Sequence, residues 1–377
     1  MIALIVFLSI PPVPALQGPD KPPLHDTDAP LWKVDLKPIG LAKVTISIWP
    51  SGFDFADADT LVVAWLLPEQ TQAPLNLSPN VAVPAKLNVA LLDAQTGKLR
   101  SKYELTVPSR PVQVYVTARG NLLISSGESL RLLSLAFKEL KEVHFAKPPA
   151  GGTHFKISPG GRRLFVCPST ADGLQAQLLD ADTLQVVDAF PANFSPISYY
   201  PGDRFTLAYD NKPPNFFIRD AGESWQLFPA HTSAKQPQNP VHTSYSFLNE
   251  TTLITQSLSS SCCFSVLTPE GKMLFTESLP KGHMWGSVTT SRDGHYFAIE
   301  QDRMRGLTIP TLDMYAFGSA DQLVIYSLSN QAEVFRVKVQ GVSPWYPKPL
   351  FQQYALSPDG SLVAMITKGV VTTYRVP

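Results

Sequence analysis

The sequence predicts an all-β protein in which one unit of four antiparallel strands is repeated seven times. Proline accounts for 35 of the 377 residues, and because proline breaks interior helices, its spread along the chain argues against a helical bundle. Turn centres at residues 57, 119, 160, 202, 249, 293 and 359 separate pairs of short apolar runs. The four steps between 119 and 293 are close to the roughly 40–45 residues of a four-stranded repeat.

Composition narrows the function classes. Hydrophobic residues make up 44% of the chain, which is too many for a disordered polymer. Lys plus Arg and Asp plus Glu each total 31, so the formal net charge is zero. A balanced charge gives no electrostatic reason to bind nucleic acid or acidic lipid, and we expect neither partner.

The N-terminus is typical of an export signal. The apolar run Ile2–Ile10 is followed by Val13-Pro14-Ala15, which fits a small-residue cleavage site. A membrane-spanning helix needs roughly 20 apolar residues, so the run is too short to be one. We therefore expect a signal peptide over 1–18, a Pro-rich linker over 19–30 and one domain over 31–377 in a secreted or periplasmic protein. The run lacks a basic residue before it, and the alternative is a buried strand.

Each repeat begins with two apolar runs joined by a tight turn, as in Ser357-Pro358-Asp359-Gly360 and Ser158-Pro159-Gly160-Gly161. A second turn follows, as in Asp93-Ala94-Gln95-Thr96-Gly97 and Asp180-Ala181-Asp182-Thr183. Asp, Asn, Gly and Pro at these positions initiate turns or tolerate positive φ, as hairpins require. The unit therefore has four strands, a, b, c and d.

The two chain ends complete each other. The last unit has strands at Tyr354–Leu356, Ser361–Ile366 and Val370–Val376, and then the sequence stops. Its fourth strand can come from Leu31–Leu36, which precedes the first complete unit. Joining the ends in this way would leave no long free sheet edge.

These two turns resemble those of the WD40-like and YVTN-type repeat families of bacterial, secreted proteins. The resemblance covers about residues 31–377 and implies a seven-bladed β-propeller with four-stranded antiparallel blades, the N-terminal strand closing the last blade. The Trp-Asp signature of WD40 repeats is absent, so the YVTN type is nearer. An array of two-sheet sandwiches is the alternative fold.

The longest connections are expected on one face. In a propeller the b–c and d–a connections share the face that usually binds ligands. Pro68–Lys86 and Gln301–Ala320 are predicted b–c insertions, and Gly341–Leu350 is a predicted d–a connection. Aromatic residues suit sugars, peptides or a partner protein, unless they pack against the blades. Those in the long loops are Tyr315, Phe317, Trp345 and Tyr346.

Two sets of polar residues are candidate binding groups. His154, His242 and His283 lie just before or at the start of a strands, where they could converge at the mouth of the channel. Imidazoles that close can bind a metal or act in acid–base chemistry; the alternative is three separate loop histidines. The second set opens the long b–c insertion and could orient a polar ligand, or be a solvated loop. It consists of Asp302, Arg303 and Arg305.

The chain has three cysteines, Cys167, Cys262 and Cys263. The adjacent pair can form a vicinal disulfide in an oxidising compartment. Two reduced thiols facing opposite sides of a strand, or a bond to another molecule, are the alternatives. Cys167 is expected at the end of a b strand as a buried thiol.

No motif assigns a reaction. The sequence contains no CxxC, HExxH, GxSxG, P-loop or GxGxxG pattern, so no catalytic residue, metal ligand or cofactor is predicted. The leading hypothesis is an exported, non-catalytic binding or scaffold monomer that engages a protein, peptide or carbohydrate. One alternative is a lactonase-like or metal-dependent propeller enzyme that uses the channel-mouth residues. Another is the propeller subunit of a periplasmic dehydrogenase.

Overall fold

The structure is a computed structural model of the 377-residue chain. It describes residues 29–41, 50–67, 85–107, 112–145, 153–168, 175–191, 198–211, 214–228, 243–257, 263–279, 283–304, 318–339, 353–367 and 369–377.

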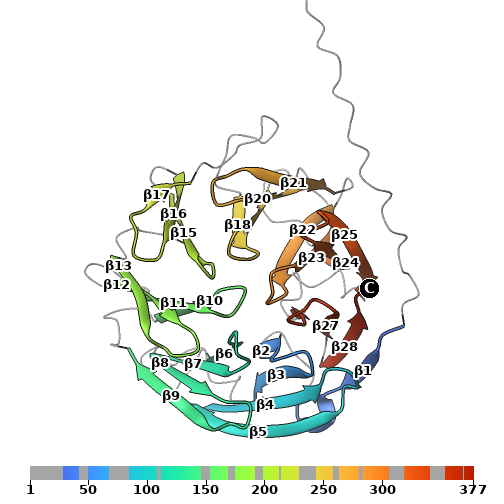
Figure 1. Ribbon diagram of the computed structural model, residues 1–377. Coiled ribbons are helices and arrows are strands. Elements are labelled where there is room, and N and C mark those ends of the chain that lie inside the picture. The colour runs from blue at the N-terminus through green and yellow to red at the C-terminus, as the bar shows by residue number, and fades with distance from the viewer. Residues whose placement is uncertain are drawn as a thin grey trace, which may run out of the picture.

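Seven four-stranded antiparallel sheets form a ring, and each sheet is one blade of a β-propeller (Figure 1). Blade 1 contains β2 (Pro50–Phe55), β3 (Thr60–Leu66), β4 (Ala85–Asp93) and β5 (Leu99–Val107). Blade 2 contains β6 (Val112–Val116), β7 (Leu122–Ser126), β8 (Ser129–Leu133) and β9 (Glu139–His144). Blade 3 contains β10 (Thr153–Ile157), β11 (Arg163–Pro168), β12 (Gln175–Asp180) and β13 (Val186–Pro191).

The remaining blades repeat this order. Blade 4 contains β14 (Ser198–Pro201), β15 (Phe205–Asn211), β16 (Pro214–Asp220) and β17 (Gln226–Leu227). Blade 5 contains β18 (Thr243–Phe247), β19 (Leu253–Ser257), β20 (Cys263–Leu267) and β21 (Met273–Ser278). Blade 6 contains β22 (His283–Thr290), β23 (Tyr296–Met304), β24 (Gly318–Ser327) and β25 (Ala332–Lys338). Blade 7 contains β26 (Gln353–Leu356), β27 (Leu362–Thr367), β28 (Val370–Arg375) and β1 (Trp32–Asp35).

The seven-bladed propeller, its four-stranded units and the positions of its turns are thus confirmed. The first strand of each blade lies nearest the axis and the fourth lies at the rim (Figure 1). Because the strands alternate in direction, the a–b and c–d turns share one end of the ring, called here the turn end. The b–c and d–a connections share the other, called here the loop end.

Burial follows the position of a strand in its blade. The second strands pack on both faces, so every residue of β7 is buried. The fourth strands face solvent on one side, so exposed and partly buried residues alternate along β5. The apolar clusters lie between neighbouring blades; one joins Trp65 and Phe55 of blade 1 to Ala364 and Ile366 of blade 7. The core is therefore a series of blade-to-blade interfaces.

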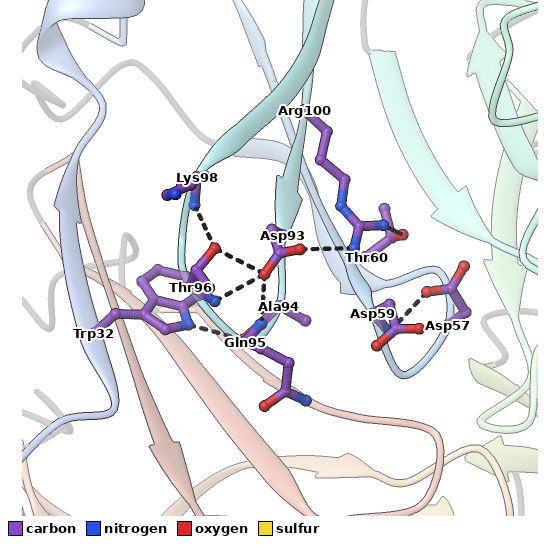
Figure 2. Close-up of polar contacts among 10 residues, drawn as sticks. All are labelled: Trp32, Asp57, Asp59, Thr60, Asp93, Ala94, Gln95, Thr96, Lys98 and Arg100. Carbon is purple, nitrogen blue, oxygen red and sulfur yellow. Dashed lines mark hydrogen bonds and ion pairs between the residues drawn. The ribbon is translucent and has the colours of Figure 1, made fainter.

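The ring closes where the sequence predicted. β1 pairs antiparallel with β28, with Trp32 opposite Thr373 and Asp35 opposite Val370. The indole Nε1 of Trp32 donates a hydrogen bond to the backbone oxygen of Ala94 at 2.8 Å (Figure 2). This bond attaches the closing strand of blade 7 to the c–d turn of blade 1.

The turn that receives Trp32 is organised by one carboxylate. Asp93 Oδ1 accepts hydrogen bonds from the backbone N–H and the hydroxyl of Thr96, both at 2.8 Å (Figure 2). Arg100 Nη2 donates to Asp93 Oδ2 at 2.7 Å, and this bond, with those from Thr96, lowers the pKa of Asp93 to about 2. In blade 3, Asp180 accepts the same two bonds from Thr183 at 2.9 Å. The repeated Asp-Ala-x-Thr pattern therefore encodes a hydrogen-bonded c–d turn.

Two predicted insertions were drawn too long. β23 continues to Met304 and β24 begins at Gly318, so both ends of the expected loop Gln301–Ala320 belong to strands. Similarly, β4 begins at Ala85, inside the expected insertion Pro68–Lys86. At both places the strands continue to pair by backbone hydrogen bonds, but their residues show no clear apolar alternation. The sequence pattern therefore did not reveal these strand ends.

The described residues contain one short 3₁₀ helix, Lys37–Ile39. Within those residues no helix has the length and apolar character needed to cross a membrane.

Replacement of Trp32 tests the seam, by which we mean the place where β1 pairs with β28 and closes the ring. The side chain is 8% exposed, so Trp32→Ala removes a buried ring and its hydrogen bond, and we expect a loss of about 3–5 kcal/mol in the free energy of unfolding. Trp32→Phe keeps most of the packing and loses the bond, at about 1 kcal/mol. Denaturant unfolding measures both. Equal effects of the two variants would contradict the assignment of Trp32 as the anchor of the seam.

Candidate functional site

A channel runs along the axis of the ring and is lined by described residues. It has a volume of about 670 Å³, and the inner strands of all seven blades contribute to its wall. It extends from Pro159 and Pro201 at the turn end to Gly127 and Thr153 at the loop end. Ligand sites of small molecules are typically of 300–1,000 Å³, so the channel is large enough to hold one.

Strand alternation places polar side chains on this wall. In β6, Val112, Val114 and Val116 are buried between blades, while Gln113 is exposed. In β10, Phe155 is buried, while His154 and Lys156 on either side of it are exposed. Because successive side chains of a strand point to opposite faces, His154 and Lys156 share one side of β10.

Lys156 lies over an aromatic ring of the next blade. Its Nζ is 5.1 Å from the centre of the Tyr200 ring, which is a cation–π distance. Surrounding protein lowers the pKa of Lys156, and the nearby Cys167 opposes that shift. Burial raises the pKa of the Cys167 thiol. Cys167 lies in β11, directly opposite His154, at the position that the sequence predicted for it.

Blade 1, two blades away in the ring, contributes a carboxylate to the wall. Asp54 Oδ2 is 3.5 Å from Arg292 Nη2, whose guanidinium is mostly buried. Loss of hydration raises the pKa of Asp54, although the Arg292 charge opposes that shift. Arg292 also donates to the backbone oxygens of Ala56, at 2.8 Å, and of Phe55. This side chain therefore joins blade 6 to blade 1 at the turn end.

Two tyrosine hydroxyls of the wall are bonded to protein. Tyr115 donates to the backbone oxygen of Phe155 at 2.9 Å and contacts the amide oxygen of Gln113. Burial raises the pKa of Tyr115, so the phenol stays neutral. Tyr354 donates to Glu300 Oε1 at 3.2 Å, and Glu300 is only 4% exposed.

The turn end is held by hydrogen bonds between neighbouring blades. Ala118 N donates to Gly161 O at 2.9 Å, and Gly160 N donates to Asp203 Oδ2 at 2.9 Å. Asn249 Nδ2 donates to Gly294 O at 2.8 Å, and Asp293 N donates to Pro358 O at 3.0 Å. These bonds join blades 2 to 3, 3 to 4, 5 to 6 and 6 to 7. These bonds hold the turns of neighbouring blades in place at the turn end. We therefore look for a ligand site at the loop end.

The structure describes only part of the predicted site. His154 lines the channel, and His283 begins β22, the inner strand of blade 6, at the same end of the ring. The register places His283 opposite Arg303 and Met284 opposite Asp302. Asp302 and Arg303 therefore lie in β23, and their assignment to the opening of a loop was wrong.

The other predicted residues lie outside the described part of the chain: His242, Arg305, Tyr315, Phe317, Trp345, Tyr346 and Cys262. Convergence of the three histidines therefore stays a prediction, as does the vicinal disulfide. Cys263 is the first residue of β20 and is partly buried. In the described ranges, no group of three His, Cys, Asp or Glu side chains is placed to hold a metal ion.

Sequence reasoning missed several residues of the wall. Lys156 is two positions from His154 in the same strand, and this spacing was the available signal. Asp54 and Arg292 are 238 positions apart in the sequence, and only the closed ring brings them together. Tyr200 was also missed, because its contact with Lys156 depends on the angle between two blades.

Comparisons with known proteins support the fold. Neither a protein-family model nor a curated protein sequence matches the chain. A chain of the mitotic checkpoint complex crystal structure is similar at a TM-score of 0.51 and 13% identity, with 100% of this chain and 99% of that chain covered. Raptor from Chaetomium thermophilum gives 0.53 and 12% identity, covering 88% of this chain and 29% of Raptor.

The C-terminal WD40 domain of Sif2 is also similar, with a TM-score of 0.45, 12% identity and coverage of 93% of this chain and 99% of that domain. At such identities these likenesses show the fold alone.

Two glycine substitutions test how tightly the blades meet at the turn end. Gly161 and Gly222 both have positive φ, 73° and 79°. A Cβ at Gly161 would lie 2.8 Å from Ala118 N, whereas one at Gly222 would meet nothing within 4 Å. Gly222→Ala should cost about 1–2 kcal/mol of unfolding free energy for its backbone conformation alone. Gly161→Ala should cost about 1–3 kcal/mol more, measured by denaturant unfolding; equal costs would contradict close contact between blades 2 and 3.

Proposed function

We propose that this protein is an exported binding propeller that engages a ligand or partner at the loop end of its channel. The channel carries this proposal: its wall draws on all seven blades and presents exposed Gln113, His154 and Lys156 side chains. The bonds between blades at the turn end support the choice of the opposite end, since they leave little freedom for turns to adapt to a ligand.

A propeller fold alone assigns no reaction. The polar groups of the wall are suited to recognition because they are spaced around a cavity and donate or accept hydrogen bonds. A protein, a peptide or a carbohydrate remains the proposed partner class, on the strength of the aromatic residues in the long b–c and d–a connections of the sequence.

Export is tested by the mature N-terminus. The apolar run and Val13-Pro14-Ala15 lead us to expect a native chain that begins between Leu16 and Gly18. Mass spectrometry of the protein purified from its own cells measures this. An intact Met1 in a protein recovered with the cytoplasm would remove export from the proposal and leave the binding site to be tested separately.

Binding is tested with glycan and peptide arrays and two pairs of matched variants. Gln113→Ala and His154→Ala alter the loop-end half of the channel. Gln95→Ala and His295→Ala remove the same side-chain types from exposed positions at the turn end. For the best array ligand we expect the first pair to weaken binding about five-fold or more, equivalent to about 1 kcal/mol. The second pair should change it less than two-fold.

Calorimetry with the free ligand gives the affinities. If Gln95→Ala and His295→Ala weaken binding while Gln113→Ala and His154→Ala do not, the ligand binds at the turn end and the proposed location is wrong. Failure of every array member to bind the native protein would count against a peptide or a carbohydrate partner.

A further inference from the structure

We infer that the channel recognises a neutral sugar, held against the inner strands of blades 4, 5 and 6 by the hydroxyls of Tyr200, Ser246 and Thr289. The inference rests on the proposed function and names the ligand class of the same site. Three hydroxyls that the described protein leaves without a hydrogen bond carry it, together with the balance of charge around the channel.

One residue of each inner strand occupies the same level of the channel. In every blade the residue after the inner strand donates its backbone N–H to a backbone oxygen at or beside the start of the second strand, as Ser158 does to Arg163. These equivalent bonds align the penultimate residues of the seven inner strands, which we call the inner layer. In blade order they are Asp54, Tyr115, Lys156, Tyr200, Ser246, Thr289 and Ala355. The first six line the channel.

Blades 1 to 3 place groups in the inner layer that already have protein partners. The Asp54 carboxylate is 3.5 Å from the Arg292 guanidinium. The Tyr115 hydroxyl donates to a backbone oxygen of blade 3 at 2.9 Å. The Lys156 ammonium lies 5.1 Å from the centre of the Tyr200 ring and has a further interaction within the protein. The layer therefore holds one carboxylate and one ammonium, whose charges cancel, and neither awaits a partner.

Blades 4 to 6 present hydroxyls instead. Tyr200, Ser246 and Thr289 lie on the channel wall, and none of their hydroxyls makes a hydrogen bond within the described part of the chain. Ser246 is exposed, and the other two residues are partly exposed. The imidazole of His154, nearer the loop end, likewise has no hydrogen bond to described residues. A ligand in this part of the channel meets three hydroxyls and an imidazole, none of which carries a permanent charge.

These groups select a neutral ligand that is rich in hydroxyls. A hydroxyl both donates and accepts hydrogen bonds, so three of them can bond to the hydroxyls of a sugar in either direction. An ionised ligand would lose hydration in the channel without gaining an opposite charge that lacks a partner. Phe53 and Tyr354 also line the channel, and aromatic rings offer flat apolar faces to the C–H face of a sugar. A cavity of about 670 Å³ accommodates a mono- or disaccharide.

The first test varies the charge of the sugar while its ring stays the same. Calorimetry with the whole mature chain measures the methyl glycosides of glucose, galactose and mannose. Each is compared with the corresponding uronic acid, which is an anion, and with the corresponding 6-amino-6-deoxy sugar, which is a cation. We expect at least one neutral sugar to bind about ten-fold or more tightly than both of its charged counterparts, because a charge would be buried without compensation.

Variants then assign the binding to the inner layer. Ser246→Ala and Thr289→Val each remove one hydroxyl with little change in side-chain size, and each should weaken binding of the neutral sugar about five-fold or more. The matched controls are Ser224→Ala in the c–d turn of blade 4 and Thr106→Val in β5, both at exposed positions. They should change the affinity less than about two-fold. Thermal unfolding confirms that each variant is folded, and Thr289→Ala replaces Thr289→Val if the latter does not fold.

Several outcomes would overturn the inference. Equal binding of neutral, acidic and basic sugars would refute a neutral ligand but support a binding channel, so the proposed function would stand. If no sugar binds while an array peptide binds and depends on Gln113 and His154, the inference fails and the proposed function is supported. A sugar affinity that survives both Ser246→Ala and Thr289→Val, or falls equally with the two controls, would show that the hydroxyls of the inner layer do not hold the sugar.

Discussion

Every blade of this ring depends on having a neighbour on each side. The apolar clusters join the face of one sheet to the face of the next, as Trp65 of blade 1 does with Ile366 of blade 7. A four-stranded sheet alone would leave both faces in water, so no blade can form its core without the others. The ring therefore needs its last interface as much as any other, and that interface uses both ends of the chain. β1 completes blade 7 by pairing with β28, and the Trp32 indole extends the contact to blade 1.

Closure places different demands on the two ends of the ring. At the turn end the turns of neighbouring blades approach closely. A Cβ at Gly161 in blade 3 would lie within 3 Å of Ala118 in blade 2. Hydrogen bonds also link neighbouring blades at this end, such as Gly160 N to the Asp203 carboxylate and the Asn249 amide to the Gly294 backbone oxygen. The channel side chains Gln113, His154 and Lys156 lie on the inner strands that these contacts between blades hold in place.

The fold was predictable because its signals are local. Asp93-Ala94-Gln95-Thr96 and Asp180-Ala181-Asp182-Thr183 are turns whose hydrogen bonds lie within four residues, so the sequence alone shows them. The pairing of Leu31–Leu36 with Val370–Val376 followed from counting strands. The site was less predictable, because its contacts join distant blades. His154 could be placed from its strand, but the contact of Lys156 with Tyr200 and that of Asp54 with Arg292 depend on how blades are angled around the axis. The extension of β23 through Asp302 and Arg303 was missed since hydrogen-bonded pairing with β24, and not an apolar pattern, keeps these residues in a strand.

The seam also determines at which end of the ring residue 31 and the C-terminal residues lie. Leu31 N donates to Thr373 O, and Val376 N donates to Ser361 O in the a–b turn of blade 7. Residue 31 and the final residues of the chain thus leave the ring together, on the side away from the long connections. A fusion partner, a purification tag or a solid support joined at either position would therefore attach at the turn end. The loop end of the channel would stay accessible to solvent.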